Sequence, residues 1–539
     1  MTADKFKFKR HASIGAAAAE EDERFLAECF IHTGDLTSLG DCSDPRRIVL
    51  GRTGIGKTAL LNRLAEEKDS IVINPESLSF NYITNSNILQ FFLEAGVNLD
   101  LFFKLLWRHV FTVELLKRKY NITNDDAKRG FLSRMSGILS RNKAKEKAIS
   151  YLSEWGEHFW EETEYRVKEV TGRIENELRS SVGTKHLPVE LSATGASMLS
   201  EEEKIEVVQR GQSVINDIQM KALTDVLEFL NEDVFTDAKH HYFICIDKLD
   251  ENWVDDKFRY LLIRSLIETV RDFLRVRNVK IVVALRTDLI ERVIRLTRGE
   301  GFQEEKYRSL YLQLRWTDGQ LKELLDKRVN FLVRQSYTKK PVGYKDVLPI
   351  TIDKQPAVQY MIDRTLMRPR ELIEFFNDCI EQAEGKATIT KTMVLTAEGE
   401  YSKNRLRSLQ DEWITDYHSL IAFSTILKKK PKQFRLEELD RAELEQFCLD
   451  YSVSNPHRGD LLSVSAFVFA EGTGGYERFL QNLFHVFYRT GLVGLKTETY
   501  QGFQWIQNGP SSIAAETIGM ETSVNIHPMF WRVLGIRPY

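Results

Sequence analysis

The sequence predicts an α/β fold with a doubly wound, mostly parallel sheet. A large helical insertion, a helical lid and a C-terminal winged-helix-like domain are expected to extend it. Three observations predict the sheet: an apolar strand that enters a glycine-rich loop near residue 51, a second strand that ends in an aspartate, and a third that ends in an arginine. Groups at the carboxyl ends of parallel strands lie along one edge, where open α/β sheets bind their ligands.

The glycine-rich loop is the segment Gly51–Thr58, Gly-Arg-Thr-Gly-Ile-Gly-Lys-Thr, which fits the pattern G-x-x-x-x-G-K-[ST]. Ile48–Leu50 predicts a buried strand before it, and Ala59–Ala65 predicts an apolar-faced helix after it. Glycines let the main chain wrap a phosphate, and the helix N-terminus adds partial positive charge. The segment is therefore predicted to be the P-loop of an NTPase. The residues expected to contact the nucleotide are Gly51, Arg52, Thr53, Gly54, Ile55, Gly56, Lys57, Thr58 and Ala59.

Within this loop, Lys57 is expected to place its charge on the β- and γ-phosphates, and the Thr58 hydroxyl to ligate Mg²⁺. A P-loop also needs a carboxylate at the end of a neighbouring strand to hold the metal shell. Tyr242–Asp247 supplies one, because five apolar residues precede Asp247. The alternative is a buried strand that ends in an ordinary surface aspartate.

Hydrolysis needs a further residue that orients the attacking water. Many such ATPases place a glutamate directly after the metal-binding aspartate, but that position is Lys248 here. Asp250 or Glu251 must then serve, and Asp250 is the preferred candidate. A slow or non-hydrolysing nucleotide switch stays open as an alternative.

The third strand ends in a candidate sensor of the bound nucleotide. Phe258–Leu274 has apolar residues at helical spacing, and Val279–Leu285 is a β-branched run that ends at Arg286. An arginine at this strand end can contact a γ-phosphate through two of its nitrogens. The alternative is a surface arginine that caps a loop.

These three motifs together resemble the STAND/AAA+-like P-loop ATPases of bacteria, close to the KAP type. The resemblance implies that the chain binds ATP and couples it to conformational switching or oligomerisation, in bacterial signalling or antiphage defence. ATP is expected over GTP because of this resemblance and because the sequence has no Asn-Lys-x-Asp motif.

A fourth segment, Met367–Leu372, is similar to the sensor-2 helix of AAA+ lids, in which the arginine after the proline reaches the nucleotide. By position this role falls to Arg370. Arg368 stands where such lids more often have glycine. The alternative is a solvated arginine in the first turn of a helix that begins near Pro369.

A long insertion separates Thr58 from Asp247, and most of it has helical periodicity. The pattern predicts an antiparallel helical hairpin. Such a stripe is usually core, and the functional alternative is a projecting arm that contacts a second copy or a nucleotide-gated protein partner. The apolar positions are Leu152, Trp155, Phe159, Val167, Val170, Ile174 and Leu178 on one helix, and Val208, Ile215, Ile218, Ala222, Val226 and Phe229 on the other.

The C-terminal half predicts a small helical lid and then helices followed by two strands, Leu492–Lys496 and Gly502–Gln507, which suggests a winged helix. Winged helices can bind DNA, and a basic run at 428–435 lies nearby, although a solvated loop is the favoured explanation of that run. The predicted domains are 1–84 and 236–340 for the two parts of the ATPase core, 85–235 for the helical insertion, 341–405 for the lid and 406–539 for the winged-helix-like domain.

The composition fits a globular protein: 539 residues, 42% hydrophobic and 28% charged, with a formal net charge of −3. This balance excludes a wholly disordered chain and a general polycation. Five scattered cysteines predict a reducing compartment, and the charges within Leu99–Leu116 exclude a membrane span there. A cytoplasmic protein that does not contact a membrane is expected.

The sequence therefore predicts an ATP-dependent molecular switch that binds Mg-ATP, hydrolyses it slowly, and moves its lid and C-terminal domain. Two alternatives remain open. One is an ATP-gated DNA-binding protein of the origin-recognition ATPase type. The other is a non-hydrolysing nucleotide-binding scaffold, which the lysine after Asp247 favours.

Overall fold

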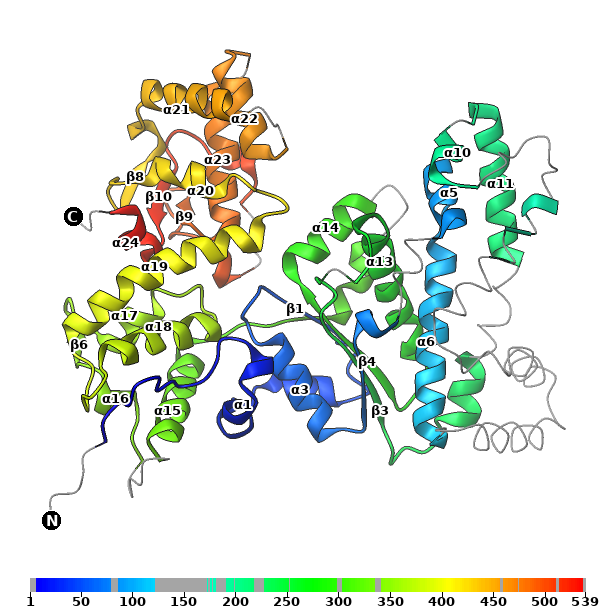
Figure 1. Cartoon of the computed structure of the whole chain (residues 1–539), viewed down its shortest axis with the longest axis horizontal. Coiled ribbons are helices and arrows are strands. Elements are labelled where there is room, and N and C mark those ends of the chain that lie inside the picture. Colours follow the sequence, from blue (N-terminus) through cyan, green and yellow to red (C-terminus); the bar gives the residue numbers. More distant parts are fainter. Residues whose placement is uncertain are drawn as a thin grey trace. The chain divides into compact units, whose positions relative to one another are not determined.

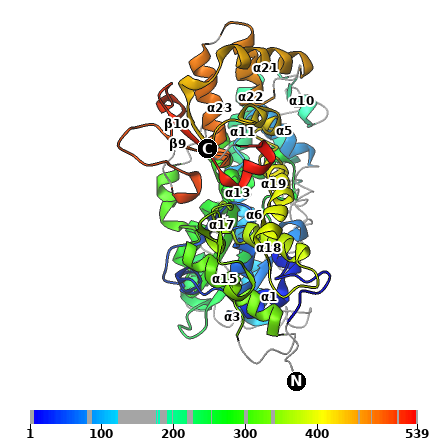
Figure 2. The same cartoon turned by 90° about the vertical axis from the view of Figure 1, so that its left-hand side faces the viewer.

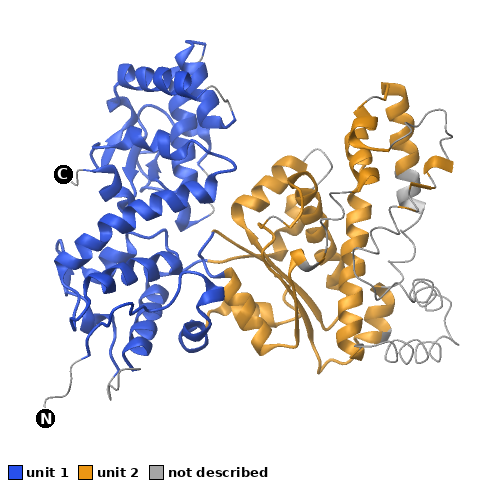
Figure 3. Cartoon of the chain, in the orientation of Figure 1, with its two compact units in different colours: residues 1–31, 53–56, 315–539 blue, residues 32–52, 57–314 orange. Residues whose placement is uncertain are grey.

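The structure is a computed structural model, and it divides the chain into two compact units (Figure 3). Unit 1 comprises Met1–Ile31, Thr53–Gly56 and Arg315–Tyr539, and unit 2 comprises His32–Arg52 and Lys57–Leu314. Four residues of the glycine-rich loop are thus grouped with the C-terminal half of the chain. The described residues are 6–78, 86–121, 172, 175–176, 178–180, 191–197, 199–217, 227–251, 253–297, 303–334, 341–455, 459–473, 475–509 and 513–536.

Unit 2 is built around a five-stranded sheet with the order β2-β3-β4-β1-β5, in which all neighbouring strands are parallel. The strands are β1 (Ile48–Gly51), β2 (Ser70–Ile73), β3 (Tyr242–Ile246), β4 (Val279–Arg286) and β5 (Tyr311–Gln313). The helices of this unit include α2 (Gly34–Gly40), α3 (Lys57–Glu67), α5 (Asn87–Ala95), α6 (Asp100–Tyr120), α10 (Ala193–Ser197), α11 (Glu201–Asp217), α13 (Asp256–Asp272) and α14 (Thr287–Thr297).

The central strands are buried on both faces, which explains their nearly unbroken runs of isoleucine and valine. Ile48, Ile244 and Ile281 belong to the core that faces α6 and α13. Figure 1 shows α3 on one side of the sheet and α6 with α13 on the other. Because helices cover both faces of a parallel sheet, the predicted doubly wound P-loop NTPase fold is confirmed.

Helices α6 and α13 pack closely because α6 is aromatic along its buried face. The Trp107 indole donates a hydrogen bond to the Leu262 carbonyl at 2.9 Å, and its ring meets Trp253 edge-on at 6.5 Å. The insertion therefore begins as part of the hydrophobic core of unit 2. Most of the predicted hairpin, including 152–171 and 218–226, lies outside the described residues, so the projecting arm stays a prediction.

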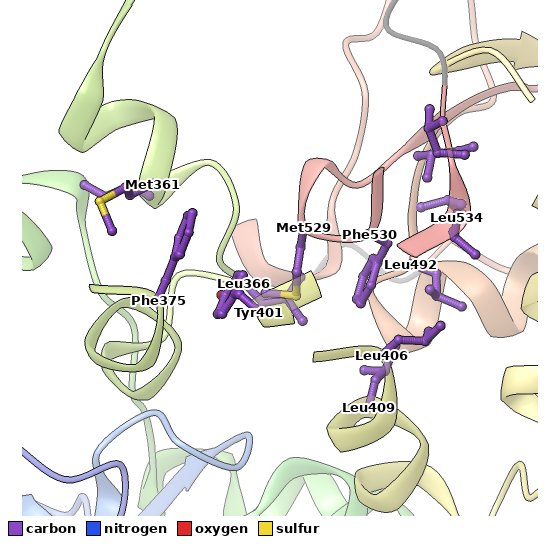
Figure 4. Packing of buried hydrophobic residues seen from close by; sticks show 14 of the residues in the cluster. Met361, Leu366, Phe375, Tyr401, Leu406, Leu409, Leu492, Met529, Phe530 and Leu534 are labelled. Atoms are coloured by element: carbon purple, nitrogen blue, oxygen red, sulfur yellow. The ribbon is translucent and has the colours of Figure 1, made fainter. Parts of the chain in front are cut away.

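Unit 1 is mostly helical, and α19 runs through its middle (Figures 1 and 2). Tyr401 of α19 stacks on Phe375 with ring centroids 4.4 Å apart. Figure 4 shows Leu406 and Leu409 of the same helix beside Phe530 and Leu492. The elements of this unit include α1 (Glu23–Cys29), α15 (Asp318–Arg334), α16 (Tyr344–Val347), β6 (Thr351–Ile352), β7 (Gln355–Pro356), α17 (Ala357–Ile362), α18 (Pro369–Gln382), α19 (Lys391–Trp413), α20 (Leu420–Ser424), β8 (Gln433–Arg435), α21 (Arg441–Ser454), α22 (Leu461–Ala470), α23 (Tyr476–Thr490), β9 (Val493–Lys496), β10 (Ser523–Ile526) and α24 (Trp531–Leu534).

The C-terminal residues form an antiparallel three-stranded sheet with the order β8-β10-β9. The predicted strand Gly502–Gln507 is wrong, since only Gln504 makes a bridge there, to Leu495, and a short 3₁₀ helix follows. The Trp505 indole covers Gly494 so closely that a Cβ on Gly494 would lie 2.6 Å from it. The Trp505 indole thus packs where further hydrogen bonds between β9 and Gly502–Gln507 would have formed. The strand that pairs with β9 is β10. The winged-helix-like assignment stays a prediction.

A buried lysine joins β4 to the turn before β1. Lys280 is fully buried, and its ammonium donates to the carbonyls of Ser38, Asp41 and Asp44 at 2.8, 2.7 and 3.1 Å. Burial lowers the pKa of Lys280 to about 8, so the group is still charged at neutral pH. Three main-chain carbonyls, one in α2 and two in the segment between α2 and β1, therefore depend on a single side chain.

We expect Lys280→Met to lower the free energy of unfolding by about 2–4 kcal/mol, because the carbonyls lose their donor while the stem is kept. Urea unfolding followed by circular dichroism measures this. Lys257→Met is the control, since the exposed Lys257 makes only a surface ion pair with Glu94, at 3.0 Å. An equal loss in both variants would contradict the assigned role.

No helix among the described residues combines the length and the apolar character that crossing a membrane requires.

Candidate functional site

The glycine-rich loop connects the carboxyl end of β1 with the first residue of α3, as its sequence predicts. Gly54 and Gly56 have φ angles of +77° and +101°, which side-chain-bearing residues rarely adopt. The Lys57 ammonium donates to the carbonyls of Gly51 and Arg52 at 3.0 and 3.3 Å. The lysine is thus folded over the start of the loop.

Lys57 has three carboxylates in its surroundings. Burial lowers the pKa of the Lys57 ammonium, while Asp250, Asp247 and Asp288 raise it. The structure therefore brings together the lysine, the strand-end aspartate and the preferred water-orienting candidate, all within unit 2. Such a cluster of opposed charges is typical of a phosphate and metal site.

Asp247 directly follows β3 and is half-buried in unit 2. Burial raises the pKa of its carboxyl group, and the nearby Thr58 hydroxyl lowers it. Its Oδ1 accepts a hydrogen bond from the Lys248 N–H at 2.8 Å. Its Oδ2 is buried and accepts no hydrogen bond from any residue that the structure describes. A buried carboxylate oxygen with free lone pairs beside a threonine hydroxyl fits a Mg²⁺ ligand set.

The turn after β3 separates the two candidates for orienting water. Lys248 has a φ of +63°, and its ammonium lies 3.8 Å from a Glu251 carboxylate oxygen. A carboxylate oxygen of Asp250 instead lies 3.5 Å from the Arg286 guanidinium, and its negative charge raises the pKa of Lys57. Asp250 is therefore the acidic residue that belongs to the cluster.

Arg286, the candidate sensor, is in register with Gly51 of the neighbouring strand β1. Its guanidinium donates to both carboxylate oxygens of Asp288, at 3.0 and 2.9 Å, in addition to its ion pair with Asp250. A bidentate carboxylate thus orients the arginine. The sequence reasoning missed Asp288, although its position two residues after a strand-end arginine could have indicated it.

The remaining four residues of the loop, Thr53–Gly56, make their contacts within unit 1. The Trp316 indole donates to the Ile55 carbonyl at 2.8 Å, and Arg368 donates to the Thr53 carbonyl at 3.0 Å. The Arg370 main-chain N–H lies 3.4 Å from the Gly54 carbonyl. Neither Trp316 nor Arg368 was predicted to take part in the site.

The Arg370 side chain lies against Gly54. A Cβ on Gly54 would be 2.9 Å from the Arg370 Cβ, so the glycine is required by close approach as well as by its φ angle. The Arg370 Nε donates to the Ala17 carbonyl at 2.9 Å. The structure thus places the predicted sensor-2 arginine on the glycine loop, and its contact with a nucleotide stays a prediction.

Arg368 is buried and bound on several sides. It donates to Glu412 of α19 at 2.9 Å, and its Nε lies 3.5 Å from Glu371. Burial opposes the charge of Arg368, but Glu412 and Glu371 raise its pKa. The residue that departs from the usual glycine at this position therefore connects the loop with two helices.

The chain is similar to known proteins in two comparisons. Residues 319–410 match the family model described as the FunZ-associated C-terminal helical domain, and this segment contains Arg368 and Arg370. A Walker-type ATPase of Pyrococcus abyssi is 12% identical, with 97% of this chain and 98% of that chain covered and a TM-score of 0.35. The ORC2 protein of Aeropyrum pernix, in ADPNP–ADP complexes, is 12% identical over 95% and 98%, with a TM-score of 0.34. A search among curated proteins gave no match.

Proposed function

We propose that this protein is a P-loop ATPase that acts as a molecular switch, binding Mg-ATP at Gly51–Thr58 and Asp247. The observation that supports this most is the cluster of Lys57, Asp247 and Asp250, in which one buried carboxylate oxygen of Asp247 lacks a hydrogen-bond partner among the described residues. Burying such an oxygen is costly unless a ligand satisfies it. A Mg²⁺ ion bound there with the nucleotide would do so.

In this proposal each residue of the site has a distinct role. Lys57 would leave its loop carbonyls for the β- and γ-phosphates, and Thr58 with Asp247 would hold a Mg²⁺ ion, which would supply charge neutralisation on the phosphate oxygens. Asp250 orients the attacking water and accepts its proton. Arg286, held by Asp288, responds to the γ-phosphate, and Arg370 responds through its contact with the loop.

The output of the switch is proposed to be motion of the lid and C-terminal helices. Arg368 supports this, because it binds the loop carbonyl of Thr53 and Glu412 of α19 simultaneously. The helix α19 continues into the packing around Phe530 (Figure 4). The role in bacterial signalling or antiphage defence rests on the resemblance of the motifs to STAND/AAA+-like ATPases. A homo-oligomer or protein partner bound through 85–235 stays a prediction.

The non-hydrolysing scaffold is the second candidate, since Lys248 follows Asp247 and is in a left-handed conformation. The DNA-binding alternative has weaker support. In the basic run, Lys430 pairs with Glu443 and Arg435 pairs with Glu437, each at 3.1 Å, which reduces the local positive charge.

Metal-dependent nucleotide binding tests the proposal. We expect the wild-type chain to bind ATP more tightly with Mg²⁺ than with EDTA, measured by calorimetry. Asp247→Asn should lose most of this difference, because a neutral amide is a much weaker ligand of a hard cation than a carboxylate. Asp237→Asn, on the exposed side before β3, is the control and should keep it. No ATP binding by the wild type would overturn the proposal.

A further inference from the structure

We propose that Trp316 is a positioning residue of the phosphate-binding loop, acting together with Arg368, and that it raises the affinity for the phosphate chain of a nucleotide without touching it. This inference rests on the proposed nucleotide binding and assigns a role to residues outside the motif.

The first step is that three consecutive carbonyls of the loop are held from one body. Trp316 donates a hydrogen bond to the Ile55 carbonyl, and Arg368 donates one to the Thr53 carbonyl. The Arg370 main-chain N–H lies 3.4 Å from the Gly54 carbonyl. All of these residues belong to unit 1. The loop tip is thus fixed by side chains that come more than 250 positions later in the chain.

The second step follows from the peptide bond. In a trans peptide, the carbonyl of one residue and the N–H of the next point in opposite directions, and no peptide bond among the residues that the structure describes is cis. Holding the carbonyls of Thr53, Gly54 and Ile55 toward Trp316 and the two arginines therefore turns the N–H groups of Gly54, Ile55 and Gly56 away from them. Successive N–H groups that face one side form a concavity that binds anions.

The third step is that the loop needs this support. Gly54 and Gly56 have positive φ angles, and glycine loses more conformational freedom than any other residue when its backbone is fixed. When the loop is already ordered before the anion binds, less ordering accompanies binding, and the affinity is therefore higher. Trp316 and Arg368, which donate to the loop carbonyls, therefore raise the affinity for phosphate by ordering the loop backbone and not by contacting the ligand.

The two side chains are themselves well fixed. Arg368 is 5% exposed and is held between Glu412 and Glu371, so its position does not depend on the loop. Removing Arg368 would take the arginine charge away from two buried carboxylates, and the variant could fail to fold. Trp316 is half-buried and offers a cleaner test, since phenylalanine keeps a ring but has no N–H.

The experiment is equilibrium binding of ATP and of inorganic tripolyphosphate to the full chain and to Trp316→Phe. We expect both dissociation constants to rise by about three- to tenfold, because one hydrogen bond that orders the loop is lost. The two ligands should be affected by the same factor, since the loop contacts phosphates and not the base. The thermal unfolding midpoint without ligand is measured in parallel.

Trp531→Phe is the matched control. Trp531 is also half-buried in unit 1, and its indole N–H also donates to a main-chain carbonyl, that of Ile526, at 2.8 Å. It should lower the midpoint as much as Trp316→Phe does but leave both dissociation constants unchanged. Wild-type constants in the Trp316 variant, or an equal weakening in the control, would overturn this inference alone. No binding by the wild type would overturn the proposed function as well.

Discussion

Replacing Lys57 with alanine is expected to weaken ATP binding by roughly a hundredfold or more, because two charge-assisted contacts with the β- and γ-phosphates are lost. The surroundings enlarge the effect. Asp250 and Asp247 both act on the Lys57 ammonium, so its removal leaves two carboxylates where a polyanion must bind. Isothermal titration calorimetry with ATP and Mg²⁺ measures the change.

The control for this prediction is Lys68→Ala. Lys68 directly follows α3 and is exposed, so it lies at the opposite end of that helix from Lys57 and outside the charge cluster. It should bind ATP as the wild type does. Affinity retained in Lys57→Ala would refute the assignment of Gly51–Thr58 as the phosphate site, whatever the behaviour of the control.

Replacing Asp250 with asparagine is expected to lower ATP turnover by about a hundredfold or more and to leave ATP affinity nearly unchanged. The carboxylate would act as a base in the hydrolysis step, and such groups contribute about 10²–10⁴-fold in rate. An asparagine keeps the shape and the hydrogen-bonding oxygen but cannot accept the proton. Phosphate release in single-turnover conditions separates this rate from binding.

The comparison variants for turnover are Glu251→Gln and Asp237→Asn. Glu251 lies near Lys248 and is the competing candidate, so a larger loss in Glu251→Gln would transfer the role to it. Asp237 precedes the same strand β3 and pairs with His240, so it reports the effect of removing a carboxylate elsewhere. A wild-type chain that binds ATP but releases no phosphate would favour the non-hydrolysing scaffold.

The sequence was sufficient for the parts of the site that are local in the chain. The spacing of glycines around Lys57 predicts the turn, and an apolar run before Asp247 predicts a buried strand, because both signals depend only on neighbouring residues. The helix between Asp247 and Arg286 was predicted over Phe258–Leu274 and is found at Asp256–Asp272. These elements place Lys57, Asp247 and Arg286 in one unit.

The parts that could not be predicted depend on contacts between distant positions. Strand β5 has only three residues, too few for a periodic signal, so no local pattern indicated that Trp316, three residues after it, donates to the Ile55 carbonyl of the loop. The pairing of Arg368 with the Thr53 carbonyl joins positions that no local pattern relates. The predicted strand at Gly502–Gln507 failed for the same reason, because a packed indole displaced the ladder there.

The assignment of Thr53–Gly56 to the C-terminal unit has a consequence for how the motif is inherited and transferred. The eight residues of the loop are adjacent in the sequence, but the carbonyls of Thr53 and Ile55 accept hydrogen bonds from Arg368 and Trp316, which come more than 250 positions later. If the loop were grafted with its own strand and helix onto another protein, its sequence would be transferred without Trp316 and Arg368, the donors to its carbonyls. Under the proposed role of Trp316, substitutions at this position would weaken nucleotide binding as substitutions within the loop do.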